Sequence, residues 1–221
     1  MKLDVLPAGL FTPLRLAVQD GIASFGKFAW SSNHDTQPFS YWYFNLCGTA
    51  DANTENMETK LLGGSRSRGL ALEAWNLVKS LHGGEGCTLL RAIAYVHEWN
   101  AAPYPHISIG GREGDKTVVL YLNKQWDEAW QGETVLRATK DTEEQMITPA
   151  PNRILSFDAD RLHEVRPAVG TYAARASLVF RLTSVANVQK ALVAPASLDA
   201  PVLRTGASRM TGGELRPRGQ R

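Results

Sequence analysis

Residues 88–99 read TLLRAIAYVHEW and open a series of short apolar segments that continues to residue 183. The later segments are TVVLYLN at 117–123, ETVLRA at 133–138, RILSFDA at 153–159 and ASLVFRLT at 176–183. Glycine, proline, asparagine and aspartate residues separate the segments, which is typical of strands joined by turns. Because no helices of about 10–15 residues alternate with these strands, the pattern predicts an antiparallel sandwich or jelly roll rather than a parallel α/β sheet.

The residues before this β region indicate helices and additional strands. We expect a helix from Pro13 to about Ile22, a short strand at Phe25–Trp30, and a second helix whose apolar residues run from Leu70 to Leu81 and which ends at Gly83. The aromatic segment QPFSYWYFNL at 37–46 suits a strand or helix that covers one face of a core.

The predicted organisation is one structural domain, mainly β with N-terminal helices. Residues 1–87 are expected to form a helical and mixed support region at the substrate entrance. Residues 88–183 are expected to form the β core, and residues 184–221 a partly flexible C-terminal extension.

Composition narrows the class of protein. The chain has 221 residues, of which 43% are hydrophobic, so it can bury a core and is not a disordered polymer. The formal charge of +2 comes from an arginine-rich C-terminal end, so the near-neutral remainder argues against binding of polymeric nucleic acid. Without a long apolar run or a signal peptide, we expect a cytoplasmic protein that is not bound to a membrane. Cys47 and Cys87 have no CxxC spacing and are expected to be buried free thiols.

Two histidines and one arginine stand out within the β region. His106 and His163 lie on the short segments YPHISIG and ADRLHEVRP, and Arg175 follows His163 by twelve residues at the start of a strand. Two imidazoles can share a metal ion, and the planar guanidinium of arginine can bind a carboxylate through two parallel hydrogen bonds. The pattern predicts a metal-binding pair and a carboxylate anchor.

The order of these motifs resembles the core of Fe(II)/2-oxoglutarate oxygenases of the prolyl-hydroxylase type. The matching residues, over roughly 88–182, are His106, Tyr121-Leu122-Asn123, Trp126, Gln131-Gly132-Glu133, Pro151, Arg153, Phe157, His163, Pro167 and Arg175. The resemblance implies a double-stranded β-helix, also called a jelly roll or cupin-like core, with Fe(II), 2-oxoglutarate and O2 as cofactor and cosubstrates. It also implies that His106 and His163 bind iron, and that Arg175 and Tyr121 bind the distal carboxylate of 2-oxoglutarate. Tyr95 is a further candidate for that carboxylate.

One position departs from the pattern of this family. Its hydroxylases have H-x-D, because alternate residues of a strand point the same way and can bind one metal together, whereas here the third position is Ser108. Family members that lost this carboxylate include halogenases, in which chloride binds iron in its place. Ser108 leaves room for chloride and can donate a hydrogen bond to it. We therefore expect a halogenase that chlorinates an unactivated C–H bond of a free small molecule in natural-product biosynthesis.

Two other functions remain open. In a hydroxylase of a small molecule or protein residue, Ser108 would be a weak ligand, or Glu113 or Asp115 would replace the missing carboxylate. In a cupin-like binding module the fold would carry no catalysis.

The predicted substrate is a (deoxy)adenine nucleotide such as dAMP, as in chlorinated nucleoside antibiotic pathways. The glycine-flanked segment LLGGSRSRG at 61–69 predicts a mobile loop, on which Arg66 and Arg68 can hold a phosphate or can simply be solvated. Tyr41, Trp42 and Tyr43 can stack a base or can be core aromatics. The sequence does not indicate an oligomeric state.

Overall fold

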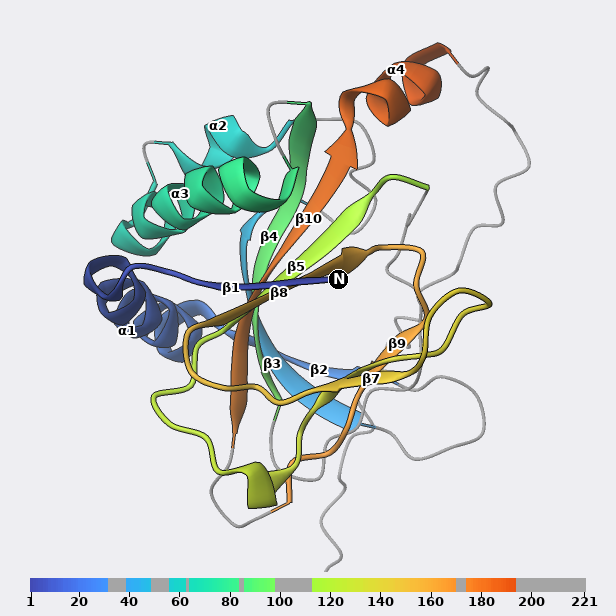
Figure 1. Ribbon diagram of the computed structural model, residues 1–221. Helices are drawn as coiled ribbons and strands as arrows, with labels where there is room; N and C mark the ends of the chain where they lie inside the picture. Colours follow the sequence, from blue (N-terminus) through green and yellow to red (C-terminus); the bar gives the residue numbers. More distant parts are fainter. Residues whose placement is uncertain are drawn as a thin grey trace, which may run out of the picture.

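The structure is a computed structural model that describes residues 1–31, 39–48, 56–62, 64–83, 86–97, 113–169 and 174–193. Its described strands form two antiparallel sheets (Figure 1). The larger sheet has the order β1 (Lys2–Val5), β8 (Arg153–Asp158), β5 (Lys116–Tyr121), β10 (Arg175–Ser184), β4 (Cys87–His97), β3 (Phe39–Cys47) and β2 (Lys27–Ser31). The smaller sheet has the order β7 (Gln145–Ile147), β6 (Thr134–Leu136) and β9 (His163–Val165).

Helices cover one face of the larger sheet. They are α1 (Ala8–Phe25), α2 (Glu58–Leu61) and α3 (Arg66–Val78), and α3 continues into a π-helical turn at Lys79–Gly83. Figure 1 shows α1 and α3 on one side of the larger sheet and the smaller sheet on the other. A fourth helix, α4 (Val185–Val193), follows β10 directly.

The alternation of side chains along the central strands separates two apolar clusters. Val118 and Leu120 of β5 belong to the cluster shared with the helices, which also contains Trp75 of α3 and Phe180 of β10. Their neighbours Val119 and Tyr121 belong to the cluster between the two sheets. We call the sheet face toward the helices the outer face and the face toward the smaller sheet the inner face. Because both faces of β5 are covered, its sequence is an almost unbroken apolar run.

The predicted antiparallel β core is confirmed, and the arrangement is that of a double-stranded β-helix with a few helices added. Each of the five apolar segments contains a strand, and the aromatic segment 37–46 lies largely within strand β3. The short strands β7 and β9 were not predicted, because three residues are too few to show an alternating pattern.

Two local predictions were wrong. The first helix begins at Ala8, with Pro7 at the N-cap, so that Pro13 lies inside the helix rather than at its start. Pro13 has no N–H, so the helix lacks the backbone hydrogen bond to the carbonyl of Gly9. Because Gly9 is exposed, water can donate to that carbonyl instead. Arg66 and Arg68 do not lie on a loop but form the first turn of α3 after Ser65.

Both cysteines are free thiols, with Cys47 buried and Cys87 half-buried. Burial raises the pKa of the Cys47 thiol to about 11, so the thiol stays protonated and unreactive. Within the described residues, no helix combines the length and the apolar character needed to cross a membrane.

Helix α1 approaches β3 closely at Gly21. A Cβ atom at this glycine would lie 2.6 Å from Cε1 of Phe44, whereas a Cβ atom at Gly69 in α3 would meet nothing within 4 Å. We expect Gly21→Ala to lower the free energy of unfolding by about 1–3 kcal/mol through overpacking. The matched Gly69→Ala should raise it by about 0.5–1 kcal/mol, because alanine favours helix. Urea denaturation measures both, and equal stabilisation by the two variants would contradict the close packing of α1 on β3.

Candidate functional site

The inner face carries polar side chains within an otherwise apolar cluster. Val119, Tyr121, Leu155 and Phe157 from the larger sheet pack against Leu136 and Ile147 from the smaller one. Each of the expected site residues that the structure describes on β4, β5, β9 and β10 lies on or next to this face. The space between the two sheets is therefore the candidate site.

Arg175 lies at the start of β10 and is only 3% exposed. Its Nη2 donates to Oγ1 of Thr134 at 2.8 Å, and its guanidinium carbon lies 5.0 Å from the centre of the Tyr121 ring. The Tyr121 hydroxyl also contacts Oγ1 of Thr134, at 2.7 Å. Within the part of the chain that the structure describes, the buried Nε of Arg175 has no hydrogen-bond partner.

These contacts make Arg175 a suitable carboxylate anchor. Thr134 and Tyr121 are neutral, and no carboxylate among the described residues forms an ion pair with Arg175. A buried cation without a counter-ion is costly, and an anionic ligand would supply the missing charge and accept the unused Nε–H. This orphaned donor fits the expected 2-oxoglutarate carboxylate.

His163 begins β9 and is 6% exposed. Its Nδ1 lies 2.8 Å from the carbonyl oxygen of Arg161, and its ring meets the Phe157 ring edge to face at 4.8 Å. Because a carbonyl can only accept, Nδ1 carries the proton, and in the neutral imidazole Nε2 then keeps its lone pair. That tautomer is the one in which a histidine binds a metal through Nε2.

Strand β6 connects the two groups. Thr134 contacts Arg175, and Leu136, two residues later, is the cross-strand partner of His163. Two residues of a strand span about 7 Å. This separation suits a five-carbon dicarboxylate held by Arg175 at one end and by a metal on His163 at the other.

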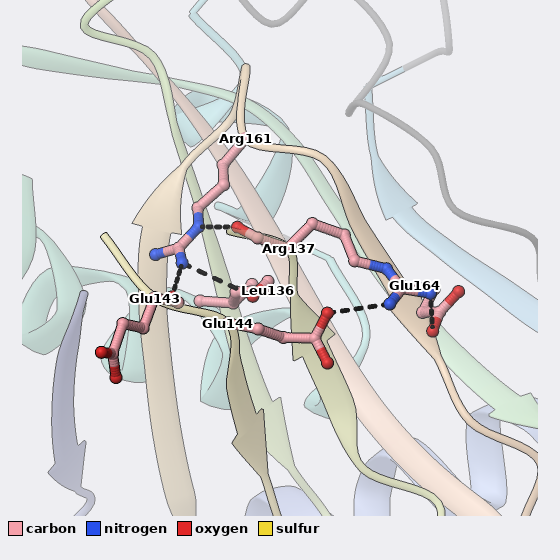
Figure 2. A network of polar contacts seen from close by, with 6 residues as sticks. All are labelled: Leu136, Arg137, Glu143, Glu144, Arg161 and Glu164. Atoms are coloured by element: carbon pink, nitrogen blue, oxygen red, sulfur yellow. Dashed lines mark hydrogen bonds and ion pairs between the residues drawn. The ribbon is translucent and has the colours of Figure 1, made fainter. Parts of the chain in front are cut away.

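The segment that leads into β9 is fixed by Arg161 (Figure 2). Its Nε donates to the carbonyl of Arg137 at 3.1 Å, and its Nη2 donates to the carbonyl of Glu143 at 3.1 Å, with a longer contact of 3.5 Å to the carbonyl of Leu136. The carbonyl oxygen of Arg161 itself accepts the hydrogen bond from Nδ1–H of His163. Arg161 therefore bonds the end of β6 and the segment before β7 through its side chain, and orients the imidazole through its own carbonyl.

Arg137 adds a second connection, seen beside Arg161 in Figure 2. Its guanidinium bonds Glu144 at 2.8 Å and Glu164, the residue after His163, at 2.6 Å. The hydrogen bonds that Arg137 donates to Glu144 and to Glu164 raise the pKa of its guanidinium. Neither arginine was singled out from the sequence, because their role depends on strand pairing rather than on a motif.

Several expected site residues lie on β3 and β4. Tyr41, Tyr43, Tyr95 and His97 form an aromatic cluster in which the Tyr41 ring is 5.7 Å from Tyr95, 6.1 Å from Tyr43 and 5.9 Å from His97. Tyr95 and Tyr121 both pair with Ser177 of β10, one from each side, so they share the inner face with Arg175. Tyr95 thus remains a candidate for the cosubstrate region.

The expected nucleotide site is not assembled. Trp42 pairs with Val96, which packs against the outer cluster, so Trp42 lies on the opposite face from Tyr41 and Tyr43. Arg66 and Arg68 begin α3, which covers the outer face. A phosphate on these arginines would be separated by the sheet from a base stacked on Tyr41 or Tyr43.

The remaining candidates bear on the metal site. His106 and Ser108 lie outside the described residues, and among the residues that are described no three histidine, cysteine or acidic side chains gather around one point. Asp115 is buried, and its carboxylate accepts hydrogen bonds from Thr183 and Asn187. Asp115 could replace the missing ligand only if these bonds broke, and Glu113 is exposed.

Arg161 can be tested as the residue that holds the His163 segment. We expect Arg161→Ala to lower the free energy of unfolding by about 1–3 kcal/mol, because three carbonyls, two of them in part-buried hydrogen bonds, lose a charged donor. Amide hydrogen exchange should accelerate in β6 and β9. Arg161→Lys should recover only part of the loss, since lysine lacks the fork that reaches several carbonyls. Lys140→Ala, at a 90% exposed side chain, is the control. Unchanged exchange in β6 and β9 of Arg161→Ala would contradict this role.

Comparison with known proteins finds a match to one family model over part of the chain. Residues 90–181 match the family model of the 2OG-Fe(II) oxygenase superfamily. No curated protein matches the sequence.

Solved structures share the fold. A prolyl hydroxylase from Trichoplax adhaerens, in complex with a hypoxia inducible factor peptide fragment, is 17% identical with a TM-score of 0.61, and the match covers 88% of this chain and 87% of that one. A Pseudomonas putida prolyl-4-hydroxylase is 17% identical with a TM-score of 0.59, covering 83% and 91%. An oxidoreductase of the 2OG-Fe(II) oxygenase family from Burkholderia pseudomallei is 16% identical with a TM-score of 0.58, covering 82% and 84%. The chain is thus similar to the 2OG-Fe(II) oxygenase superfamily in sequence over residues 90–181, and it shares the fold of these solved structures.

Proposed function

We propose that this protein is an Fe(II)/2-oxoglutarate-dependent hydroxylase of a C–H bond in a small molecule or a peptide. The observation that carries the proposal is the buried guanidinium of Arg175: among the described residues its Nε has no partner, and its printed contacts are to the neutral Thr134 and Tyr121. When bound, iron would supply the oxidising chemistry with O2, while 2-oxoglutarate is converted to succinate and carbon dioxide.

Arg175 would bind the distal carboxylate of 2-oxoglutarate. Thr134 accepts a hydrogen bond from Nη2 of Arg175 and contacts the Tyr121 hydroxyl. The three side chains therefore form one network that holds the guanidinium in place. The Tyr121 ring under the guanidinium adds a cation–π contact at 5.0 Å. The cosubstrate would therefore meet a donor set that is oriented before it binds.

His163 would bind the iron through Nε2, together with His106. The Arg161 carbonyl holds the Nδ1 proton and so selects the tautomer. Phe157 packs against the imidazole, and with Val119 and Leu155 it forms an apolar wall that limits water around the ligand. An apolar wall that excludes water protects a reactive site from side reactions.

Hydroxylation is favoured over chlorination by the structural relatives. Two of the similar structures are prolyl hydroxylases, and one of them holds a peptide. The arrangement of Arg66 and Arg68 on the outer face gives no support to the nucleotide expected for a halogenase of nucleoside antibiotic pathways.

Halogenation is kept as the second candidate on one observation. Ser108 stands where the hydroxylases of the family have a carboxylate, and a neutral side chain leaves both a position and a negative charge for a halide. The two candidates differ in whether chloride enters the iron site.

The cosubstrate site is tested by anaerobic titration of 2-oxoglutarate into the Fe(II)-loaded protein, monitored by the visible charge-transfer band. We expect Arg175→Gln to weaken 2-oxoglutarate binding about tenfold or more, because a charged hydrogen bond is lost. Tyr121→Phe should weaken it only about two- to tenfold, as a neutral hydrogen bond is worth less. Arg15→Gln on α1 is a control that keeps full affinity. His163→Ala should abolish the band, and wild-type affinity in Arg175→Gln would remove the basis of the proposal.

Chloride titration of the same complex separates the two candidates. A hydroxylase should show a band that is indifferent to chloride, whereas a halogenase should show a saturable shift. Ser108→Asp restores the carboxylate, so in a halogenase it should abolish the shift, while Ser108→Ala, which only removes the hydroxyl, should keep it. A saturable shift in the wild-type protein would decide against the hydroxylase.

A further inference from the structure

Strand β1, drawn in dark blue in Figure 1, forms one edge of the larger sheet. It pairs with β8 on one side, and no described strand pairs with its other side. Leu3 lies opposite Leu155 of the inner cluster, so Leu3 and Val5 belong to the inner face, yet their side chains are 50% and 59% exposed. An edge strand with exposed apolar side chains is a template for pairing with another chain.

The backbone of Leu3 faces this free edge. The side chain of Asn152, the residue before β8, holds both backbone groups of Leu6: the Leu6 N–H donates to Oδ1 at 3.1 Å, and Nδ2 donates to the Leu6 carbonyl at 2.7 Å. The backbone groups of Leu6 therefore point toward β8. Because such groups alternate in direction along a strand, those of Val5 and Leu3 point away from β8. In agreement, the Val5 N–H donates to the Asp4 carboxylate at 2.8 Å, in an exposed hydrogen bond.

The charges beside Leu3 make this edge complementary to itself. Lys2 precedes Leu3 and Asp4 follows it. If two β1 strands pair antiparallel about a two-fold axis at Leu3, each Lys2 lies opposite Asp4 of the other copy. The two Leu3 residues then exchange two backbone hydrogen bonds, and each Val5 lies opposite Met1 of the other copy. Opposite charges and apolar side chains both stabilise strands when they face each other in this way.

Other two-fold registers lack this complementarity. A two-fold axis through the sheet keeps the inner faces together, so the axis must pass through a residue rather than between two residues. Centres at Lys2 and at Asp4 set like charges against each other, which is destabilising. A centre at Val5 sets Asp4 opposite the apolar Leu6. Within β1, only the centre at Leu3 pairs both charges.

We propose that two copies of this chain associate by antiparallel pairing of their β1 strands about Leu3. The larger sheets of the two copies then form one continuous sheet. In the single chain the Asp4 carboxylate accepts from the exposed Val5 N–H. In the pair that N–H donates to the backbone of the other copy, and the carboxylate meets Lys2 of that copy.

The proposed assembly closes at two copies and is reversible. Both copies use the same edge, so a two-fold contact leaves no second copy of this edge free for growth into a fibre. Four residues from each copy form the strand pair, which is a smaller contact than the roughly 1,200–2,000 Å² of a standard interface. We therefore expect a dissociation constant on the order of 100 µM. This inference is independent of the proposed reaction, because none of these residues belongs to the candidate site.

The test is sedimentation velocity of the full chain over a concentration series that brackets the expected dissociation constant. The charge variants are Lys2→Asp, Asp4→Lys and the double variant that carries both changes. Leu3→Pro removes the N–H that faces the free edge without removing a bond to β8, and proline is tolerated at such a position of an edge strand. Lys27→Asp reverses an exposed charge on β2, at the opposite edge of the sheet, and is the control. Circular dichroism and thermal unfolding check that each variant is folded.

We expect a concentration-dependent dimer in the wild-type protein and in Lys27→Asp. Each single charge reversal should weaken dimerisation about tenfold or more, because symmetry turns two attractive pairs into two repulsive ones. The double variant should recover the wild-type affinity, and a mixture of Lys2→Asp and Asp4→Lys should form a heterodimer. Leu3→Pro should be folded and monomeric.

Three results would overturn the proposal. The first is a wild-type protein that stays monomeric at every concentration. The second is a dimer that both single charge reversals leave unchanged, which would place the contact elsewhere. The third is a double variant that dimerises no better than the single ones, which would exclude the register about Leu3. If Leu3→Pro proves unfolded, the charge variants alone decide.

Discussion

Strand β10 organises the whole molecule through the alternation of its side chains. It is hydrogen-bonded to β4 on one side and to β5 on the other, at the centre of the larger sheet. Its residues Leu178 and Phe180 face the helices and pack in the outer cluster, while Arg175 and Arg181 face the interior. One strand therefore supplies both the apolar contact that holds the helices and the two positive charges of the inner face. A shift of one residue in its register would bury the charges under α3 and expose the core.

The strands of this fold could be predicted from the sequence, because their composition differs from that of their turns. Residues 117–123 alternate between two apolar faces, and residues 176–183 do the same with an arginine at one inward position. The start of α3 could not be predicted in the same way. Two glycines before Ser65 suggest a loop, yet the helix begins immediately afterwards at Arg66. The apolar residues Ala71, Ala74 and Trp75 are buried in the outer cluster, and their packing stabilises the whole helix, including its first turn.

Residues of the candidate site could be proposed from the sequence only where a motif marks them. His163 and Arg175 were found by their place in a known order of residues, and the structure brings both to the space between the sheets. Thr134 and Arg161 were not singled out, since each contacts residues that are distant in the sequence. Thr134 and Arg175 are 41 positions apart and meet only because the strands pair in one particular register. A single sequence does not specify that register.

The buried charge of Arg175 would link the folding equilibrium to the concentration of an anionic ligand. Arg175 has no counter-ion among the described residues, and a desolvated guanidinium in that state lowers the stability of the folded protein, whereas an anion that binds only the folded chain returns that stability by mass action. Each tenfold rise in such a ligand above its dissociation constant adds about 1.4 kcal/mol to the folded state. If the anion is 2-oxoglutarate, the cellular pool of this keto acid sets how much of the protein stays folded and escapes proteolysis, in addition to how fast it works.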